Sequence, residues 1–156
     1  MSNCMSGVLH SINVSDGGVP KLRRDASDVR FTGVTGDRQR DLRYHGGPLR
    51  AVSLYSLELI HALQAEGHPI HVGAIGENLT LAGIAWERMV PGARVEVREV
   101  LLELTAYAAP CTNLLGCFRD GEFKRVSQKA HPGWSRLYAR VLCEGEIKVG
   151  DVVRVK

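Results

Sequence analysis

The sequence has little of what marks several large classes of protein. Its four cysteines are scattered with no Cys-x-x-Cys pair, which argues against a structural zinc site, an iron–sulfur cluster or a secreted disulfide framework. Aromatic residues make up only 6% of the chain and no base-stacking motif occurs, which argues against a nucleic-acid partner. No run approaches the roughly 20 apolar residues of a membrane span, and the first residues do not read as a signal peptide. We therefore expect a cytoplasmic protein with no membrane partner.

The composition is that of an ordinary globular protein. Hydrophobic residues make up 44% and charged residues 24% of the chain, so residues 1–156 are expected to form a single domain with its own core. The formal net charge is only +3, but the basic residues are bunched. These groups indicate either solvated loop faces or a small anionic ligand. The groups are Lys21, Arg23 and Arg24; Arg38, Arg40 and Arg43; and Arg119, Lys124, Arg125, Lys129 and Arg136.

Short alternating patterns predict a mostly β fold with a few helices, an α+β domain of barrel-like form. Apolar residues alternate over 8–14, which predicts a first strand. The alternations at 95–97 and 102–104 are out of phase, which predicts a bulge or sharp bend at 98–99. Near the end of the chain, the pair at 144–145 separates two strand patterns and predicts a hairpin.

One helix is clearly predicted, from Leu57 to Ala65. Its apolar residues share one side, Ser56 or Ser53 can cap its start, and Gly67 can end it. A parallel α/β sheet would need more helices than this chain offers.

Cys111 is the residue with the clearest chemical potential. It follows a strand-like run at 100–107 and precedes what reads as a short helix at 112–118. The amide groups that begin a helix favour an anion, so a cysteine there can be partly thiolate, a nucleophile and a soft-metal ligand. The alternative is a buried thiol that packs as a small hydrophobe.

Two glycine-rich segments provide further candidate groups. His45-Gly46-Gly47 can form an anion-binding nest of backbone amides, with a histidine that can bind phosphate, exchange protons or bind metal. Glu77-Asn78, which follows a glycine, can orient a polar heterocycle through its amide and carboxylate. The alternative for each segment is an ordinary turn.

The order of these segments is more specific than any one of them. Five short segments occur in an order and at separations that resemble the MOSC family. They are Gly36-Asp37, His45-Gly46-Gly47, Gly76-Glu77-Asn78-Leu79-Thr80, Pro110-Cys111 and Gly150-Asp151. Those are the domains related to the C-terminal part of molybdenum cofactor sulfurases. The resemblance covers nearly the whole chain, from about Gly7 to Val155.

The resemblance implies a MOSC-type β-barrel that binds the molybdenum–pterin cofactor. It also implies that Cys111 is the active-site cysteine, either as the molybdenum ligand or as a persulfide carrier. A thiolate suits a soft metal with sulfur ligands, and the pterin phosphate suits an amide nest with nearby cations. The expected cofactor-binding residues are Asp37, His45, Gly46, Gly47, Glu77, Asn78, Asn113, Arg125 and Lys129.

Some relatives reduce N-hydroxylated nitrogen compounds, so the resemblance favours a molybdenum-dependent oxidoreductase. The sequence has no flavin motif and no iron–sulfur spacing, so electrons are expected from a partner reductase. The alternative is a sulfur or cofactor carrier that receives sulfur from a cysteine desulfurase and has no catalysis of its own. No lysine has a convincing Schiff-base context, so pyridoxal phosphate is not expected.

The sequence departs from the family pattern at Ala108. Many relatives have an arginine three residues before the cysteine, and this chain has alanine there. The missing cation removes one contact to the cofactor. Lys124, Arg125 and Lys129 are the expected substitutes.

Overall fold

The computed structural model describes residues 4–17, 19–38 and 47–156. Strands dominate, and one α-helix and five short 3₁₀ segments connect them. The strands are β1 (Met5–Val14), β2 (Leu22–Arg24), β3 (Ala26–Arg30), β4 (Gly33–Val34), β5 (Val52–Ser56), β6 (Leu79–Ala82), β7 (Arg94–Val97), β8 (Val100–Ala108), β9 (Arg136–Cys143), β10 (Gly145–Lys148) and β11 (Val152–Val155). The helices are η1 (Pro48–Arg50), α2 (Leu57–Ala65), η2 (Trp86–Arg88), η3 (Thr112–Cys117), η4 (Arg119–Gly121) and η5 (Phe123–Val126).

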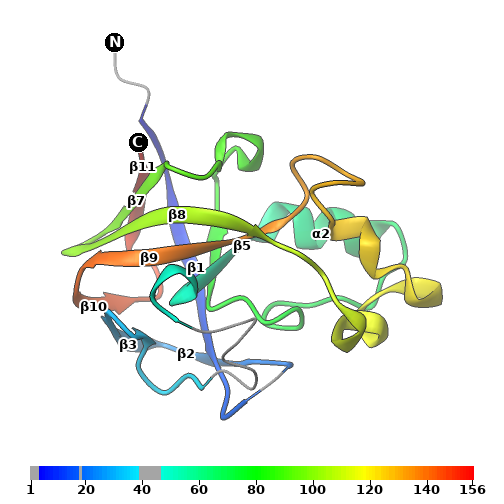
Figure 1. Cartoon of the computed structure of the whole chain (residues 1–156), viewed down its shortest axis with the longest axis horizontal. Coiled ribbons are helices and arrows are strands. Elements are labelled where there is room, and N and C mark those ends of the chain that lie inside the picture. The colour runs from blue at the N-terminus through cyan, green and yellow to red at the C-terminus, as the bar shows by residue number, and fades with distance from the viewer. Residues whose placement is uncertain (1–3, 18, 39–46) are drawn as a thin grey trace.

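Seven of these strands close into a barrel. The order is β11-β7-β8-β9-β5-β6-β1, and β1 also pairs with β11, which completes the ring; β2 extends β1 on its other side (Figure 1). Only β5 and β6 run parallel within the ring. Inward-facing apolar side chains from different strands fill the interior without solvent exposure, which confirms the predicted barrel-like β fold. Examples are Leu9, Leu54, Leu79, Leu102 and Val153.

The turn between β7 and β8 confirms the predicted break in alternation. Val97 pairs with Val100, so Arg98 and Glu99 form a two-residue turn. Arg98 has a φ of 53°, in the left-handed region that such tight hairpins require. The phase change therefore marks the end of one strand and the start of the next.

The hairpin predicted at Glu144-Gly145 is wrong. β10 pairs with β3 rather than with β9, and with β4 these strands form a separate three-stranded sheet. β9 pairs with β8 along its length and with β5 at residues 137–139, whereas all four residues of β10 pair with β3. Ile147 of β10 is fully buried where this small sheet packs.

α2 is the helix expected from the sequence and connects the parallel pair β5 and β6. The Oγ atom of Ser56 accepts a hydrogen bond from the Leu59 amide and caps the first turn. Ile60 and Leu63 are buried, and Gly67 turns the chain away with a φ of 96°. No helix in the described parts of the chain is long and apolar enough to cross a bilayer.

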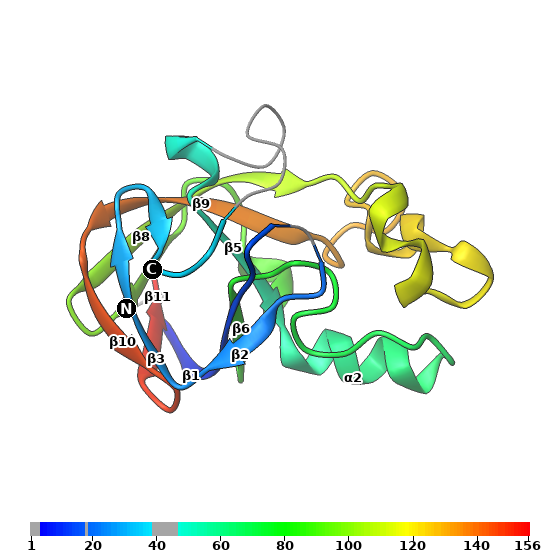
Figure 2. The ribbon, with the colours of Figure 1, turned by 90° about the horizontal axis from the view of Figure 1, so that it is seen from below.

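The segment between β8 and β9 places Cys111. It contains η3, η4 and η5, which lie with α2 at one end of the molecule, while the sheet formed by β10 and β3 lies at the other (Figures 1 and 2). The predicted short helix after Cys111 is present as the 3₁₀ segment η3.

Candidate functional site

A buried ion pair is at the centre of the site. Lys21 Nζ lies 2.6 and 2.7 Å from the two carboxylate oxygens of Asp37, and their side chains are only 6% and 4% exposed. The Ser15 amide donates to Asp37 Oδ1, and the Asn78 side chain donates to Oδ2, each at 2.9 Å. Since the carboxylate accepts hydrogen bonds from three groups, the charge of Asp37 is balanced within the protein.

Asn78 connects this ion pair to the barrel. Its side-chain oxygen accepts a hydrogen bond from the Ser53 amide at 3.0 Å, and its side-chain nitrogen also donates to the Asn13 carbonyl at 3.3 Å. The whole side-chain amide is therefore engaged, and Asn78 is fully buried. Its role in a site is to hold Asp37 and the loop before β6 against β5.

Glu77 is a fully buried carboxyl group. Its Oε2 atom accepts hydrogen bonds from the Gly73 amide at 3.1 Å and from the Thr80 hydroxyl at 3.0 Å. Its Oε1 atom is buried with no hydrogen-bond partner. Burial raises the pKa of Glu77, although these hydrogen bonds oppose the shift.

The Cys111 segment packs against the loop that carries Glu77. Cys111 immediately precedes η3 and is partly exposed. At the end of η3, the Cys117 thiol lies 3.4 Å from the Ala74 carbonyl and donates to it. Burial, with a smaller contribution from Glu77, raises the pKa of Cys117. Both thiols are partly exposed, and the Cys117 hydrogen bond helps attach the Cys111 segment to the 73–78 loop.

The described end of the glycine-rich turn lies over β8 and β9. His45 and Gly46 are outside the described residues, whereas Gly47 has a φ of 90° with nothing within 4 Å of the place where a Cβ would lie. The Thr105 hydroxyl of β8 donates to the Leu49 carbonyl. The Arg50 guanidinium lies 5.5 Å from the centre of the Tyr138 ring of β9. η1 is therefore attached to the same strand pair that leads to Cys111.

Arg136 was expected only as the last member of the third basic group and not as a cofactor-binding residue. It begins β9, is 6% exposed, and pairs across the ladder with Ala108 of β8. Its Nη1 atom lies 3.5 Å from the place where a Cβ of Gly76 would be, and Lys21 Cε lies 3.9 Å from that place. Arg136 therefore projects toward the Lys21–Asp37 pair. No local pattern distinguishes it from an ordinary strand residue.

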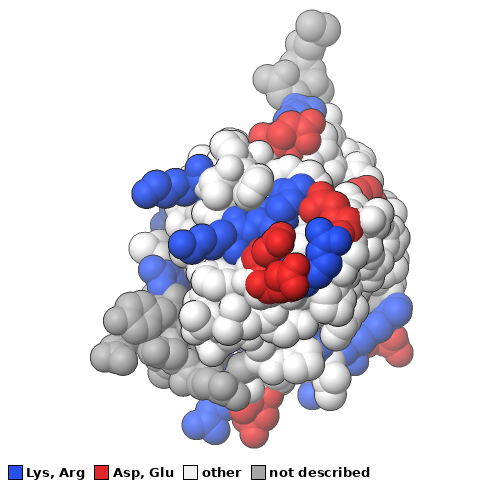
Figure 3. Space-filling model, turned by 90° about the vertical axis from the view of Figure 1, so that its right-hand side faces the viewer, with Lys and Arg blue, Asp and Glu red and all other residues white. Residues whose placement is uncertain are grey.

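The other predicted basic residues are placed differently. Arg125 donates to both carboxylate oxygens of Glu66, at 2.9 and 2.7 Å, and lies 3.9 Å from the centre of the Trp134 ring. Lys129 and Asn113 are exposed. Figure 3 shows this end of the molecule, where Lys and Arg side chains lie beside Asp and Glu. Arg125 thus holds η5 against α2 through its ion pair with Glu66, while its Nη1 atom is buried without a hydrogen-bond partner.

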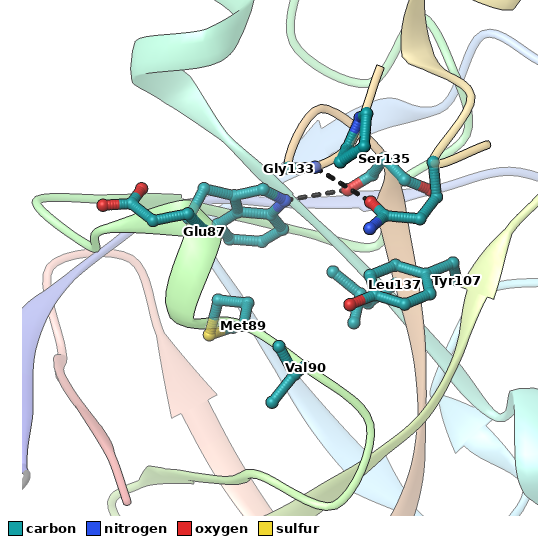
Figure 4. A pocket seen from close by; sticks show the side chains of 10 residues that line it. Glu87, Met89, Val90, Tyr107, Gly133, Ser135 and Leu137 are labelled. Atoms are coloured by element: carbon teal, nitrogen blue, oxygen red, sulfur yellow. Dashed lines mark hydrogen bonds between the residues drawn. The ribbon is translucent and has the colours of Figure 1, made fainter. Parts of the chain in front are cut away.

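A separate pocket of about 310 Å³ lies on the opposite side of the β8–β9 ladder. Tyr107 and Leu137 form the pair next to Ala108 and Arg136 in the ladder. Successive strand residues point to opposite faces, so Tyr107 and Leu137 face away from the Arg136 side and line this pocket, as Figure 4 shows. Its lining is mostly apolar, with one carboxylate, Glu87, and neither lysine nor arginine. An anionic ligand is therefore disfavoured there and favoured on the Arg136 side.

Within the described residues, no group of three or more His, Cys, Asp or Glu side chains is arranged to hold a metal ion. A metal bound by these residues would have to bring most of its own ligands. Cys111 can supply one thiolate.

Comparison with known proteins identifies a family. Residues 41–154 match the model of the MOSC domain. The uncharacterized protein YflK of Bacillus subtilis (strain 168) is 34% identical over 116 residues, which cover 74% of this chain and 52% of that protein. The chain thus spans about half the length of this curated relative.

Solved structures share the fold at low sequence identity. The YuaD protein from Bacillus subtilis matches with a TM-score of 0.75 and 18% identity, over 99% of this chain and 98% of that one. YiiM from Geobacillus stearothermophilus matches with a TM-score of 0.73 and 23% identity, over 96% and 75% respectively.

Proposed function

This chain belongs to the MOSC domain family, and we propose that it binds the molybdenum–pterin cofactor and reduces N-hydroxylated nitrogen compounds. The family is associated with molybdenum cofactor binding. The observation that best supports the proposal is the position of Cys111, whose segment packs through Cys117 on the loop that carries Glu77 and Asn78.

The chemistry of the described residues fits such a cofactor. The cofactor carries a phosphate and a soft metal that already has sulfur ligands. The site has a buried guanidinium at Arg136, beside Gly76, and a partly exposed thiol at Cys111. A guanidinium suits a phosphate, and a thiolate suits the metal. Gly76 has a φ of 89°, and the place where its Cβ would lie is 3.0 Å from Val19 Cγ1 and 3.5 Å from Arg136 Nη1, so the absence of a side chain lets this turn pack closely against both.

In this proposal each residue has a defined task. Cys111 supplies the protein's ligand to the metal. Asn78, Asp37 and Lys21 hold the loops at fixed positions through their buried hydrogen bonds, and Gly47 leaves open space for a ligand beside η1. The cofactor, when bound, supplies two-electron redox chemistry that side chains lack.

Reduction consumes two electrons, and the sequence contains neither a flavin motif nor iron–sulfur spacing. We therefore expect a separate reductase to deliver the electrons. The N-hydroxylated substrate accepts these two electrons together with two protons from solvent, its N–O bond breaks, and the oxygen leaves as water.

The test is expression in a cofactor-producing host, followed by metal analysis and turnover of a hydroxylaminopurine with a flavin and iron–sulfur donor pair. The proposal predicts about one molybdenum per chain and measurable turnover. Both should be lost in Cys111→Ser and kept in Cys143→Ser, which changes another exposed cysteine. Fully loaded protein without turnover would refute the reductase. A sulfur adduct on Cys111 after incubation with a cysteine desulfurase, without molybdenum, would instead support the carrier.

A further inference from the structure

The side chain of Arg136 finds no hydrogen-bond acceptor among the described residues. It is 6% exposed, yet among the described residues no carboxylate or carbonyl accepts a hydrogen bond from its guanidinium. Lys21, which is similarly buried, is paired with Asp37. Buried guanidinium groups are normally paired, because removing them from water is costly and they have five donors to satisfy. A guanidinium that the described residues leave without an acceptor is therefore available to a ligand.

The nearby carboxyl groups do not supply that partner. Asp37 is occupied by Lys21, the Ser15 amide and Asn78. Glu77 is close enough to interact electrostatically with Arg136, but the two form no ion pair. Burial also favours the neutral form of Glu77. The charge of Arg136 thus remains available to a ligand.

The register of the barrel explains how Arg136 fits here. Ala108 is directly opposite Arg136 on β8, three residues before Cys111, and is 2% exposed. Directly opposed residues of an antiparallel pair share a face, with Cβ atoms about 4.5–5.5 Å apart, and like charges there repel. Because Ala108 is small and uncharged, Arg136 is the one cation of this opposed pair, and no like charge on β8 repels it.

We propose that Arg136 binds an oxyanion at the Gly76 side of the site, from the strand opposite Ala108. If the proposed function is correct, on which the identity of the ligand rests, the oxyanion is the phosphate of the pterin cofactor. This assigns to Arg136 the contact that the sequence assigned to Lys124, Arg125 or Lys129. Of these, Arg125 is held by Glu66.

The experiment uses cofactor-free protein and inorganic phosphate as the probe, at constant ionic strength. Thermal unfolding is measured for wild type, Arg136→Met and Arg136→Lys. The control is Arg140→Met, which changes an arginine on the same strand that is exposed and paired with Glu103. Phosphate should raise the midpoint of the wild type and of Arg140→Met. In Arg136→Met, phosphate affinity should fall about 10- to 100-fold, the value of a charged hydrogen-bonded contact, and Arg136→Lys should be intermediate.

The unfolding midpoint without phosphate separates a binding role from a structural one. Removing an unpaired buried charge relieves its desolvation cost, so ligand-free Arg136→Met should unfold at a higher temperature than wild type. A lower midpoint, failure of Arg136→Met to fold, or an undiminished response to phosphate would each overturn the proposal. Because the assay contains no molybdenum, wild-type protein that responds to phosphate through Arg136 but never binds the cofactor would refute the proposed function alone.

Discussion

The ion pair between Lys21 and Asp37 permits a quantitative test of the site's architecture. Both side chains are more than nine-tenths buried, so removing one partner leaves an uncompensated charge in the interior. Asp37→Ala removes the acceptor of Lys21 and also removes one hydrogen bond each from the Ser15 amide and the Asn78 side chain. A cost of about 3–5 kcal/mol in the free energy of unfolding follows from this kind of disruption.

Lys21→Met should cost less, about 2–3 kcal/mol, because Asp37 keeps two hydrogen bonds, from Ser15 and Asn78. The double variant leaves no unpaired charge, so its cost should be smaller than the sum of the single costs by about 2–3 kcal/mol. Urea unfolding followed by tryptophan fluorescence measures all three variants.

The matched control is the exposed pair of Arg140 and Glu103, where the side chains are 45% and 21% exposed. Its coupling should stay below about 1 kcal/mol. If the costs of Lys21→Met and Asp37→Ala are simply additive, the two residues do not form a buried pair, and the description of the site's centre is incorrect.

Three further perturbations test other parts of the fold and site. Burial raises the pKa of Glu77 above its ordinary 4.5, so the folded protein holds a proton that the unfolded chain releases, and stability falls as the pH rises above about 4.5. Glu77→Gln cannot titrate, so its free energy of unfolding should rise relative to that of wild type between pH 5 and pH 8 in urea titrations. A difference that stays constant over this range would contradict the raised pKa of Glu77. Gly73→Ala should destabilise the protein by more than about 2 kcal/mol, because φ is 82° and the new Cβ would lie 2.4 Å from the Lys21 carbonyl oxygen. The control is Gly92→Ala, where φ is 95° but the space is open, and it should cost about 1–2 kcal/mol. Equal costs for the two variants would refute the close approach at Gly73. Ser56→Ala should lose about 1 kcal/mol by removing the cap of α2, and a Ser56→Asp variant that does not recover most of it would count against the cap.

Local sequence determined what was predicted correctly about the fold. Alternation, the cap at Ser56 and the glycine at Gly67 depend on residues close together in the chain, and they predicted the helix from Leu57 to Ala65 and the strands β1 and β7 to β10, but not β2 to β6. The pairing of β10 with β3 joins segments that are far apart in the sequence. That property belongs to the whole topology, so the turn at Glu144-Gly145 was misread as a hairpin.

The site was predictable in part for a similar reason. Asp37, Glu77 and Asn78 lie in distinctive glycine-rich segments, and the structure places them close together. Their side chains bond mainly to other parts of the protein, which sequence motifs alone did not indicate. Arg136 lies in an ordinary strand pattern, and its importance comes only from burial, missing acceptors and its pairing with Ala108.

X-ray absorption at the molybdenum edge would test most directly whether Cys111 binds the metal. Protein purified from a cofactor-producing host should contain molybdenum, and any metal retained by Cys111→Ser should have one sulfur ligand fewer than in wild type. An identical sulfur coordination in the two proteins, or wild-type protein without molybdenum, would contradict the central role of this thiol.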